Sequence, residues 1–195
     1  MRLSTNFTLS DFTKSQTATR KGHDNTPAEE HLANAKELFT NVVQPVRDNF
    51  GVTVINSGYR APALNDAVGG SSNSQHCKGE AVDIECPGTP NYDVAKWIAD
   101  NVEFDQLILE FYTPGIPDSG WVHVSSKTEG NRKSILTAMK ENGKTVYKPG
   151  GASNVAQNLS ALGMNVSLLG ITGDDPELKE LIKVMRHTSI KFDPV

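Results

Sequence analysis

Residues 74–83 read SQHCKGEAVD and set an imidazole, His76, and a carboxylate, Asp83, seven positions apart. Gly79 lies between them, and a glycine readily adopts the left-handed backbone that lets a chain fold back on itself. Residues 81–85 are typical of a short strand that is mostly buried. A loop histidine and a strand carboxylate can therefore converge on one metal ion, although this pair alone matches many sequences by chance.

A second histidine, His123, lies in the segment 121–125, WVHVS, where it alternates with apolar residues. Side chains alternate between the two faces of a strand, so His123 can point into a cleft while its neighbours are buried. A catalytic zinc site takes three protein ligands of the histidine and carboxylate type and leaves a fourth position for water. A lone strand histidine is more often an ordinary structural residue. The prediction of a zinc site therefore depends on His76, Asp83 and His123 together.

The segments around this site alternate between helical and extended patterns. Apolar residues recur at three- and four-residue steps between 28 and 49, which predicts an amphipathic helix. Pro45 interrupts this helix, so a kink or a break is expected near residues 41–44. Further helices are predicted at 61–68 and 92–101, and strands at 52–55, 81–85, 106–111 and 121–125. We expect an α+β domain in which a small antiparallel sheet with flanking helices carries the zinc site.

The composition changes at residues 148–151, KPGG. Shortly before them, residues 130–143 fit either a helix or an extended edge element. Beyond them the pattern predicts a helix, a strand at 166–169, a turn and a final helix. This rhythm differs from that of the preceding segments, so we predict a zinc-binding domain at residues 1–149 and a short α/β C-terminal appendage at 150–195.

The chain as a whole has the composition of a globular protein, with 37% hydrophobic and 22% charged residues among 195. Its formal net charge is −4, so no basic field favours nucleic acid or an anionic membrane as a partner. No apolar run is long enough to span a bilayer, and the N-terminal MRLSTNFTLSDFTKS has no apolar signal segment. Cys77 and Cys86 are too few for a disulfide framework and are expected to be reduced thiols. We expect a protein that is cytoplasmic as synthesised.

Five ordered motifs extend the pattern beyond the ligands: SGYR at 57–60, LN at 64–65, VGG at 68–70, S-x-H-x2-G-x-A-x-D at 74–83 and WVHVS at 121–125. In this order they resemble the D-alanyl-D-alanine carboxypeptidase and L-alanyl-D-glutamate endopeptidase family of zinc peptidases, and most closely the members carried by bacteriophages. The similarity covers roughly residues 6–149. It implies a zinc metallopeptidase that hydrolyses D-amino-acid-containing stem peptides of bacterial peptidoglycan.

The resemblance also implies roles for individual residues. His76, Asp83 and His123 match the family's zinc ligands. Arg60 matches the family's arginine near the site, where a guanidinium can pair with a substrate carboxylate or stabilise an oxyanion. Ser74, two residues before the first ligand, is expected to form a supporting hydrogen bond beside the ligands.

The catalytic base is where this sequence departs from the family. Many members carry an acidic residue three positions before the last histidine ligand, but Gly120 occupies that position here. Glu110 is the preferred candidate, because it ends an apolar strand that is expected to lie next to the His123 strand. Asp118, in the loop before the His123 strand, is the fallback.

The C-terminal residues resemble a second family. GGASNVAQNL at 150–159, LG at 162–163 and LGITGDD at 169–175 are similar to the N-terminal part of ribokinase-like sugar kinases. In that family the ATP-binding half and the catalytic acidic residue lie far downstream of these motifs. The resemblance therefore implies a partial segment without kinase activity.

These observations favour a cell-wall peptidase, similar to a phage endolysin, that acts on the wall after its release, for example in a phage-infected host. Two alternatives stay open: a non-catalytic cell-wall binding module, suggested by Gly120, and a sugar kinase fragment. Carboxypeptidase and endopeptidase action both fit the sequence. The oligomeric state is also left open.

Overall fold

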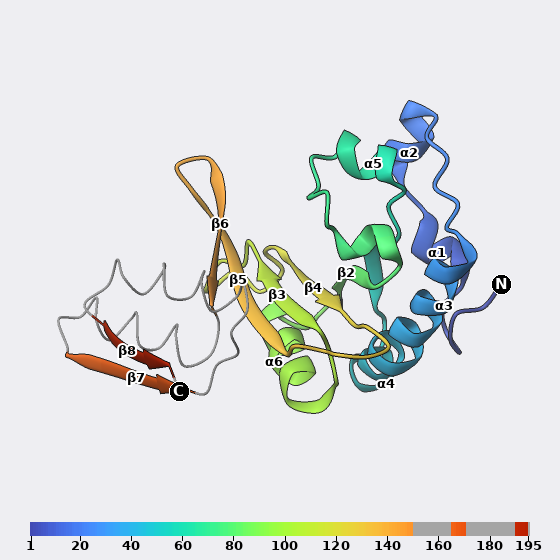
Figure 1. Cartoon of the computed structure of the whole chain (residues 1–195). Coiled ribbons are helices and arrows are strands. Elements are labelled where there is room, and N and C mark those ends of the chain that lie inside the picture. The colour runs from blue at the N-terminus through green and yellow to red at the C-terminus, as the bar shows by residue number, and fades with distance from the viewer. Residues whose placement is uncertain (150–164, 171–189, 195) are drawn as a thin grey trace. The chain divides into compact units, whose positions relative to one another are not determined.

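The computed structural model of this chain describes residues 1–149, 165–170 and 190–194 (Figure 1). The chain divides into two compact units, Met1–Ser134 and Ile135–Val195. The predicted domain boundary at residue 149 falls inside the second unit and stays a prediction. The predicted α+β class is confirmed, because helices and an antiparallel sheet build the first unit.

The first unit contains the predicted helices and strands. Its helices are α1 (Leu9–Thr13), α2 (Gln16–Lys21), α3 (Glu29–Leu38), the π-helix η1 (Phe39–Val43), α4 (Gln44–Phe50), α5 (Pro62–Ala67), the 3-10 helix η2 (Gln75–Lys78) and α6 (Asn91–Asn101). Its strands are β1 (Val54–Ser57), β2 (Ala81–Glu85), β3 (Gln106–Glu110) and β4 (Trp121–Ser125). From Ser134 onwards the chain forms an antiparallel pair, β5 (Ser134–Glu141) with β6 (Lys144–Pro149), and a parallel pair, β7 (Val166–Gly170) with β8 (Ile190–Pro194).

The expectations for the C-terminal part are met in two places. Residues 130–143, which fitted a helix or an extended element, contain the extended strand β5. The strand predicted at 166–169 is β7. The helices predicted in the appendage lie outside the described residues. Among the residues that the structure describes, no helix combines the length and the apolar character needed to cross a membrane.

The long predicted helix is interrupted where the sequence places Pro45. α3 ends at Leu38, five residues of π-helix follow in η1, and α4 begins at Gln44 with the proline in its first turn. Proline lacks the N–H that an α-helix uses at this point, and its ring crowds the carbonyl of the preceding turn. The predicted break near residues 41–44 is confirmed, and it takes the form of a widened π-helical turn.

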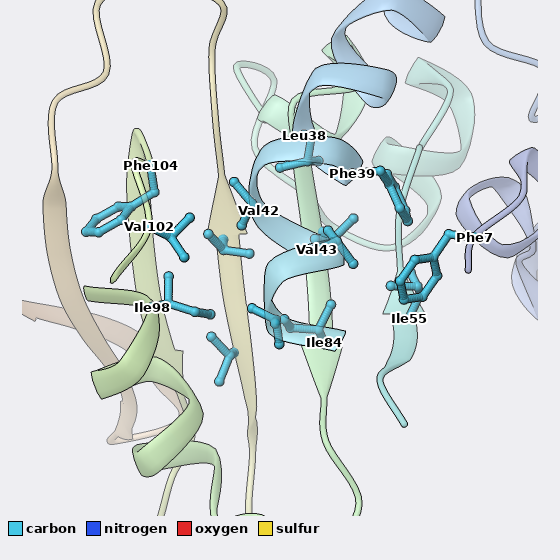
Figure 2. Close-up of a cluster of buried hydrophobic side chains, with 14 of the residues drawn as sticks. Phe7, Leu38, Phe39, Val42, Val43, Ile55, Ile84, Ile98, Val102 and Phe104 are labelled. Atoms are coloured by element: carbon cyan, nitrogen blue, oxygen red, sulfur yellow. The ribbon is translucent and has the colours of Figure 1, made fainter. Parts of the chain in front are cut away.

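Four strands of the first unit pair antiparallel in the order β1-β2-β4-β3 (Figure 1). Successive residues of each strand point to opposite faces of the sheet. One face is apolar and contributes residues of all four strands to the buried core: Ile55, Val82, Ile84, Leu107, Val122 and Val124. Helical residues complete the same core, among them Phe39, Val42, Val43 and Ile98 (Figure 2).

The strand register places the predicted ligands on the opposite face of the sheet. Asp83 of β2 pairs with His123 of β4, and His123 pairs in turn with Ile108 of β3. The register shifts between Ile55 and Ser57, so that one extra residue of β1 is inserted and Ser57 pairs with Asp83. A bulge of this kind reverses the alternation of side chains, and it turns Ser57 toward the ligand face.

Candidate metal centre

Three side chains meet on the polar face of the sheet. Asp83 extends from β2, His123 from the adjacent β4, and His76 from η2. All three are buried, with at most 8% of their surface exposed. η2 ends at Lys78, and the next residue, Gly79, has a left-handed φ of +74° that turns the chain back into β2. The predicted convergence of the loop histidine and the strand carboxylate is therefore present.

The ligand atoms of these residues form a small triangle. His123 Nδ1 lies 2.9 Å from Asp83 Oδ1 and 3.2 Å from His76 Nε2, and His76 Nε2 lies 3.2 Å from Asp83 Oδ1. In a tetrahedral zinc site with bonds of about 2.0–2.1 Å, neighbouring ligand atoms are separated by about 3.3 Å. The triangle therefore has the size of one face of such a tetrahedron, and its two imidazoles and one carboxylate suit a zinc ion.

The orientation of the His76 ring is set from its other side. Its Nδ1–H donates a hydrogen bond of 2.7 Å to the carbonyl oxygen of Gly58. With the proton on Nδ1, the Nε2 lone pair is directed at Asp83 and His123, an arrangement common among metal-binding histidines. Burial lowers the pKa of His76, and this outweighs the opposite effect of the Asp83 carboxylate. The imidazole therefore stays neutral, which is the form that binds a metal.

Arg60 binds the second oxygen of the carboxylate. Its Nη2 lies 2.7 Å from Asp83 Oδ2, and its Nε donates to Ser57 Oγ at 2.9 Å. The carboxylate is thus divided, because Oδ1 faces the two histidines while Oδ2 is held by the guanidinium. Burial alone would raise the pKa of Asp83, but its hydrogen bond with His123 helps to hold this pKa well below its usual range. The side chain is therefore ionised, and its Oδ1 could bind a metal.

Glu110 ends β3 on the same face as the triangle. It pairs with Trp121 of β4, two residues before His123, so alternation along β4 brings its position onto the ligand face. Glu110 is half-buried, and burial raises the pKa of its carboxyl. The negative charge of Asp83 raises this pKa further, while His123 and Arg60 lower it. A carboxyl with a raised pKa beside a metal site is suited to accept and return a proton.

The backbone at Gly120 is incompatible with an acidic side chain. Gly120 has a φ of +69°, a conformation that residues with a Cβ rarely adopt. A Cβ at this position would also overlap the carbonyl oxygen of Glu110. The position that carries the acid in many family members is therefore closed here, while Glu110 at the end of β3 lies on the ligand face.

Asp118 and Ser74 are the other two residues that the sequence predicted for the site. Asp118 is exposed, and it lines a hollow that also includes Cys86 and Asn91 but none of the three ligands. Ser74 precedes η2, where its carbonyl oxygen accepts the Cys77 N–H at 3.1 Å while its side chain does not cap the helix. The predicted roles of both residues stay predictions.

Sequence reasoning missed two contacts of the centre, the hydroxyl of Ser57 and the carbonyl of Gly58. Both residues belong to the SGYR motif at 57–60, in which the sequence predicted a role for Arg60 alone. The motif itself was a usable signal for Ser57. A backbone carbonyl that orients a ligand leaves no trace in the sequence, so the role of Gly58 needed the structure.

Comparison with curated proteins finds short matches. The chain is 51% identical over 43 residues to the bifunctional protein HldE of Coxiella burnetii, which covers 22% of this chain and 9% of that protein. It is 46% identical over 46 residues to HldE of Salmonella dublin, with 24% of this chain and 10% of the relative covered. The chain therefore spans about a tenth of the length of these relatives.

Two family models match consecutive parts of the chain. Residues 123–195 match the pfkB family carbohydrate kinases, which confirms the resemblance of the C-terminal residues to a sugar kinase fragment, and the match begins well before the predicted boundary. Residues 5–125 match peptidase M15 and include Arg60, Glu110 and the three ligand candidates. Peptidases of this family are zinc enzymes, in agreement with the donor set of the triangle. This chain belongs to the peptidase M15 family of metallopeptidases.

Proposed function

We propose that this chain is a zinc-dependent peptidase that hydrolyses D-amino-acid-containing stem peptides of bacterial peptidoglycan, in the manner of a phage endolysin. The observation that supports the proposal most is the triangle of His76, Asp83 and His123, whose ligand atoms lie within 3.2 Å of one another. Membership of the peptidase M15 family supports peptide hydrolysis with a metal. The ordered motifs between residues 57 and 125 support the wall peptide as substrate.

Each residue of the centre has a distinct task in this proposal. His76, Asp83 and His123 hold the metal through the three atoms of the triangle. A bound zinc ion lowers the pKa of a water molecule toward neutrality and polarises the scissile carbonyl. Glu110 accepts a proton from the attacking water and returns it to the nitrogen of the leaving amine. Arg60 keeps the Asp83 carboxylate in place, and its positive charge stabilises the developing oxyanion.

The proposed partner is the peptide part of the wall rather than a nucleic acid, in keeping with a net charge of −4. The proposed place of action is the cell wall, which the enzyme reaches after its release from the cytoplasm of a phage-infected cell. The C-terminal segment matches the pfkB family carbohydrate kinases over residues 123–195, and no kinase activity is proposed for it.

Digestion of purified peptidoglycan stem peptides, followed by mass spectrometry, tests the proposal. Release of the terminal D-alanine would identify a carboxypeptidase, and cleavage between L-alanine and D-glutamate would identify an endopeptidase. A peptide of the same sequence built from L-amino acids and a chelator-treated enzyme are the controls. Binding to the wall with the stem peptides left intact would refute the proposal and favour a non-catalytic binding module.

A further inference from the structure

We propose that Asn25 is a positioning residue of the metal centre, which acts through the backbone of residues 58–61. The inference rests on the proposed zinc site. Asn25 lies in the loop between α2 and α3, where its side chain is half-buried. It stands more than fifty positions before His76 in the sequence, so its relation to the centre exists only in the folded chain.

Both ends of the Asn25 amide hold backbone groups. Its Oδ1 accepts a hydrogen bond of 2.8 Å from the N–H of Ala61. Its Nδ2 donates to the carbonyl oxygen of Tyr59 at 2.9 Å and to that of Thr13 at 2.8 Å. One side chain therefore ties together the residues on either side of Arg60 and joins them to the end of α1.

The backbone that Asn25 holds is the segment that orients two of the three ligands. The carbonyl of Gly58 accepts the Nδ1–H of His76. The N–H of Arg60 donates to the His76 carbonyl at 3.3 Å, and the Arg60 side chain binds Asp83 Oδ2. A shift of this segment would therefore move the contacts that aim both His76 Nε2 and Asp83 Oδ1 at the metal. Asn25 acts on the ligands through these contacts and touches neither of them itself.

The three hydrogen bonds require the chemistry of an amide. Aspartate keeps an acceptor for the N–H of Ala61, but it has no N–H for the carbonyl oxygens of Tyr59 and Thr13 and would repel them. Alanine leaves all three backbone groups without this partner, which costs stability wherever water does not replace it. Loss of an outer contact of a metal ligand lowers metal affinity by about 10–100-fold. Asn25 acts one contact further out, so we expect the lower end of this range.

Zinc affinity and site geometry in the full-length chain test the inference directly. Competition with a chromophoric chelator measures the dissociation constant of zinc, and the visible spectrum of the cobalt(II)-loaded protein reports the ligand geometry. Asn25→Ala should raise the dissociation constant of zinc about tenfold and alter the cobalt spectrum. Asn25→Asp should also raise the dissociation constant of zinc and alter the cobalt spectrum. This variant serves as the test if Asn25→Ala does not fold.

Asn131 offers a matched control. Its amide also clamps a loop by accepting the N–H of Lys127 at 2.9 Å and donating to the Lys127 carbonyl at 3.2 Å, and this loop carries none of the three ligands. Asn131→Ala should lower the melting temperature but keep the zinc affinity and the cobalt spectrum of the wild type. The same pattern in Asn25→Ala would overturn the inference, because it would show a purely structural role.

A double-mutant cycle with Arg60→Lys examines the route of the effect. If Asn25 acts through the position of Arg60, then Asn25→Ala should lower zinc affinity less in the Arg60→Lys background than in the wild type. Strictly additive changes would contradict this route. Zinc binding by the wild-type chain is measured before any variant is compared. A wild-type chain that binds no zinc would refute the proposed site itself.

Discussion

Arg60 and Asp83 form an ion pair of 2.7 Å in which the guanidinium binds the carboxylate oxygen that is not directed at the histidines. The two side chains are largely shielded from water, with 20% and 8% of their surfaces exposed. Breaking such a pair by removing one partner is costly, because the remaining charge stays buried without compensation. The SGYR loop and the metal centre are therefore linked, and a change in the loop alters the ligand.

Replacement of Arg60 tests this link. Arg60→Ala should lower zinc affinity by about 10–100-fold and reduce transition-state stabilisation by about 2–4 kcal/mol. Arg60→Lys should restore only part of both, because an ammonium group cannot bind Asp83 and Ser57 with the fixed geometry of a guanidinium. Chelator competition and steady-state kinetics measure the two effects, with Arg20→Ala on α2 as the control. Wild-type values in Arg60→Ala would show that the ion pair is dispensable.

Removal of either histidine ligand should empty the zinc site. His76→Ala and His123→Ala each delete one corner of the triangle, and two remaining ligands do not hold zinc tightly. Elemental analysis of the purified chains should find one zinc per chain in the wild type and almost none in these variants. His23→Ala, in the loop before α3, should keep full zinc content. Full content in either ligand variant would rule out that ligand.

Glu110 is expected to matter for turnover and not for metal binding. Glu110→Gln should lose about 10²–10⁴-fold in activity while it keeps its zinc and its fold, because the amide has the same shape but cannot accept the proton. Asp118→Asn is the matched control and should be nearly as active as the wild type. If the two variants exchange these results, Asp118 is the base.

A chain that ends at Pro149 should retain zinc binding and stem-peptide cleavage. All three ligands, Arg60 and Glu110 lie within the unit Met1–Ser134. Metal analysis and the mass-spectrometric digestion assay compare the shortened chain with the full one. Lost cleavage with zinc still bound would mean that residues beyond 149 shape the site.

Asp105 gives the first unit a stability that depends on pH. Its fully buried carboxylate accepts hydrogen bonds from Arg132 at 2.6 and 2.9 Å and pairs with Lys127 at 3.1 Å. Burial alone would raise the pKa of Asp105, but these partners lower the pKa from 3.8 to about 2. A carboxyl group whose pKa is lowered by folding contributes its full stabilisation when the pH is above its pKa in the unfolded chain. This stabilisation is lost as the pH falls through its pKa in the folded chain.

The difference between the unfolded and folded pKa values of Asp105 corresponds to about 2 kcal/mol in the free energy of unfolding. Near neutral pH, Asp105→Asn should be less stable than the wild type by at least this amount. The difference in the free energy of unfolding between the wild type and Asp105→Asn should become smaller as the pH falls from about 4 to about 2. Both tryptophans, Trp97 and Trp121, lie in the first unit. Tryptophan fluorescence during urea unfolding therefore follows this unit alone. A gap that stays constant with pH would contradict the assignment.

The local sequence indicated which residues are candidate ligands and which elements carry them. The turn at Gly79 between His76 and Asp83, the alternation around His123 and the break at Pro45 each depend on a few neighbouring residues. Backbone preferences and side-chain alternation act over short ranges of this kind. For this reason the candidate ligands, the main strands and the interrupted helix could be predicted before the fold was known.

Only the tertiary structure decided how these residues are supported. The pairing of Glu110 with Trp121 and the overlap that closes position 120 both follow from the register of β3 against β4. The contact of Arg60 with Asp83 and the hold of Asn25 on the 58–61 backbone join segments more than twenty residues apart. Such contacts depend on how sheet, loops and helices pack around one core, and no local pattern of residues encodes that arrangement.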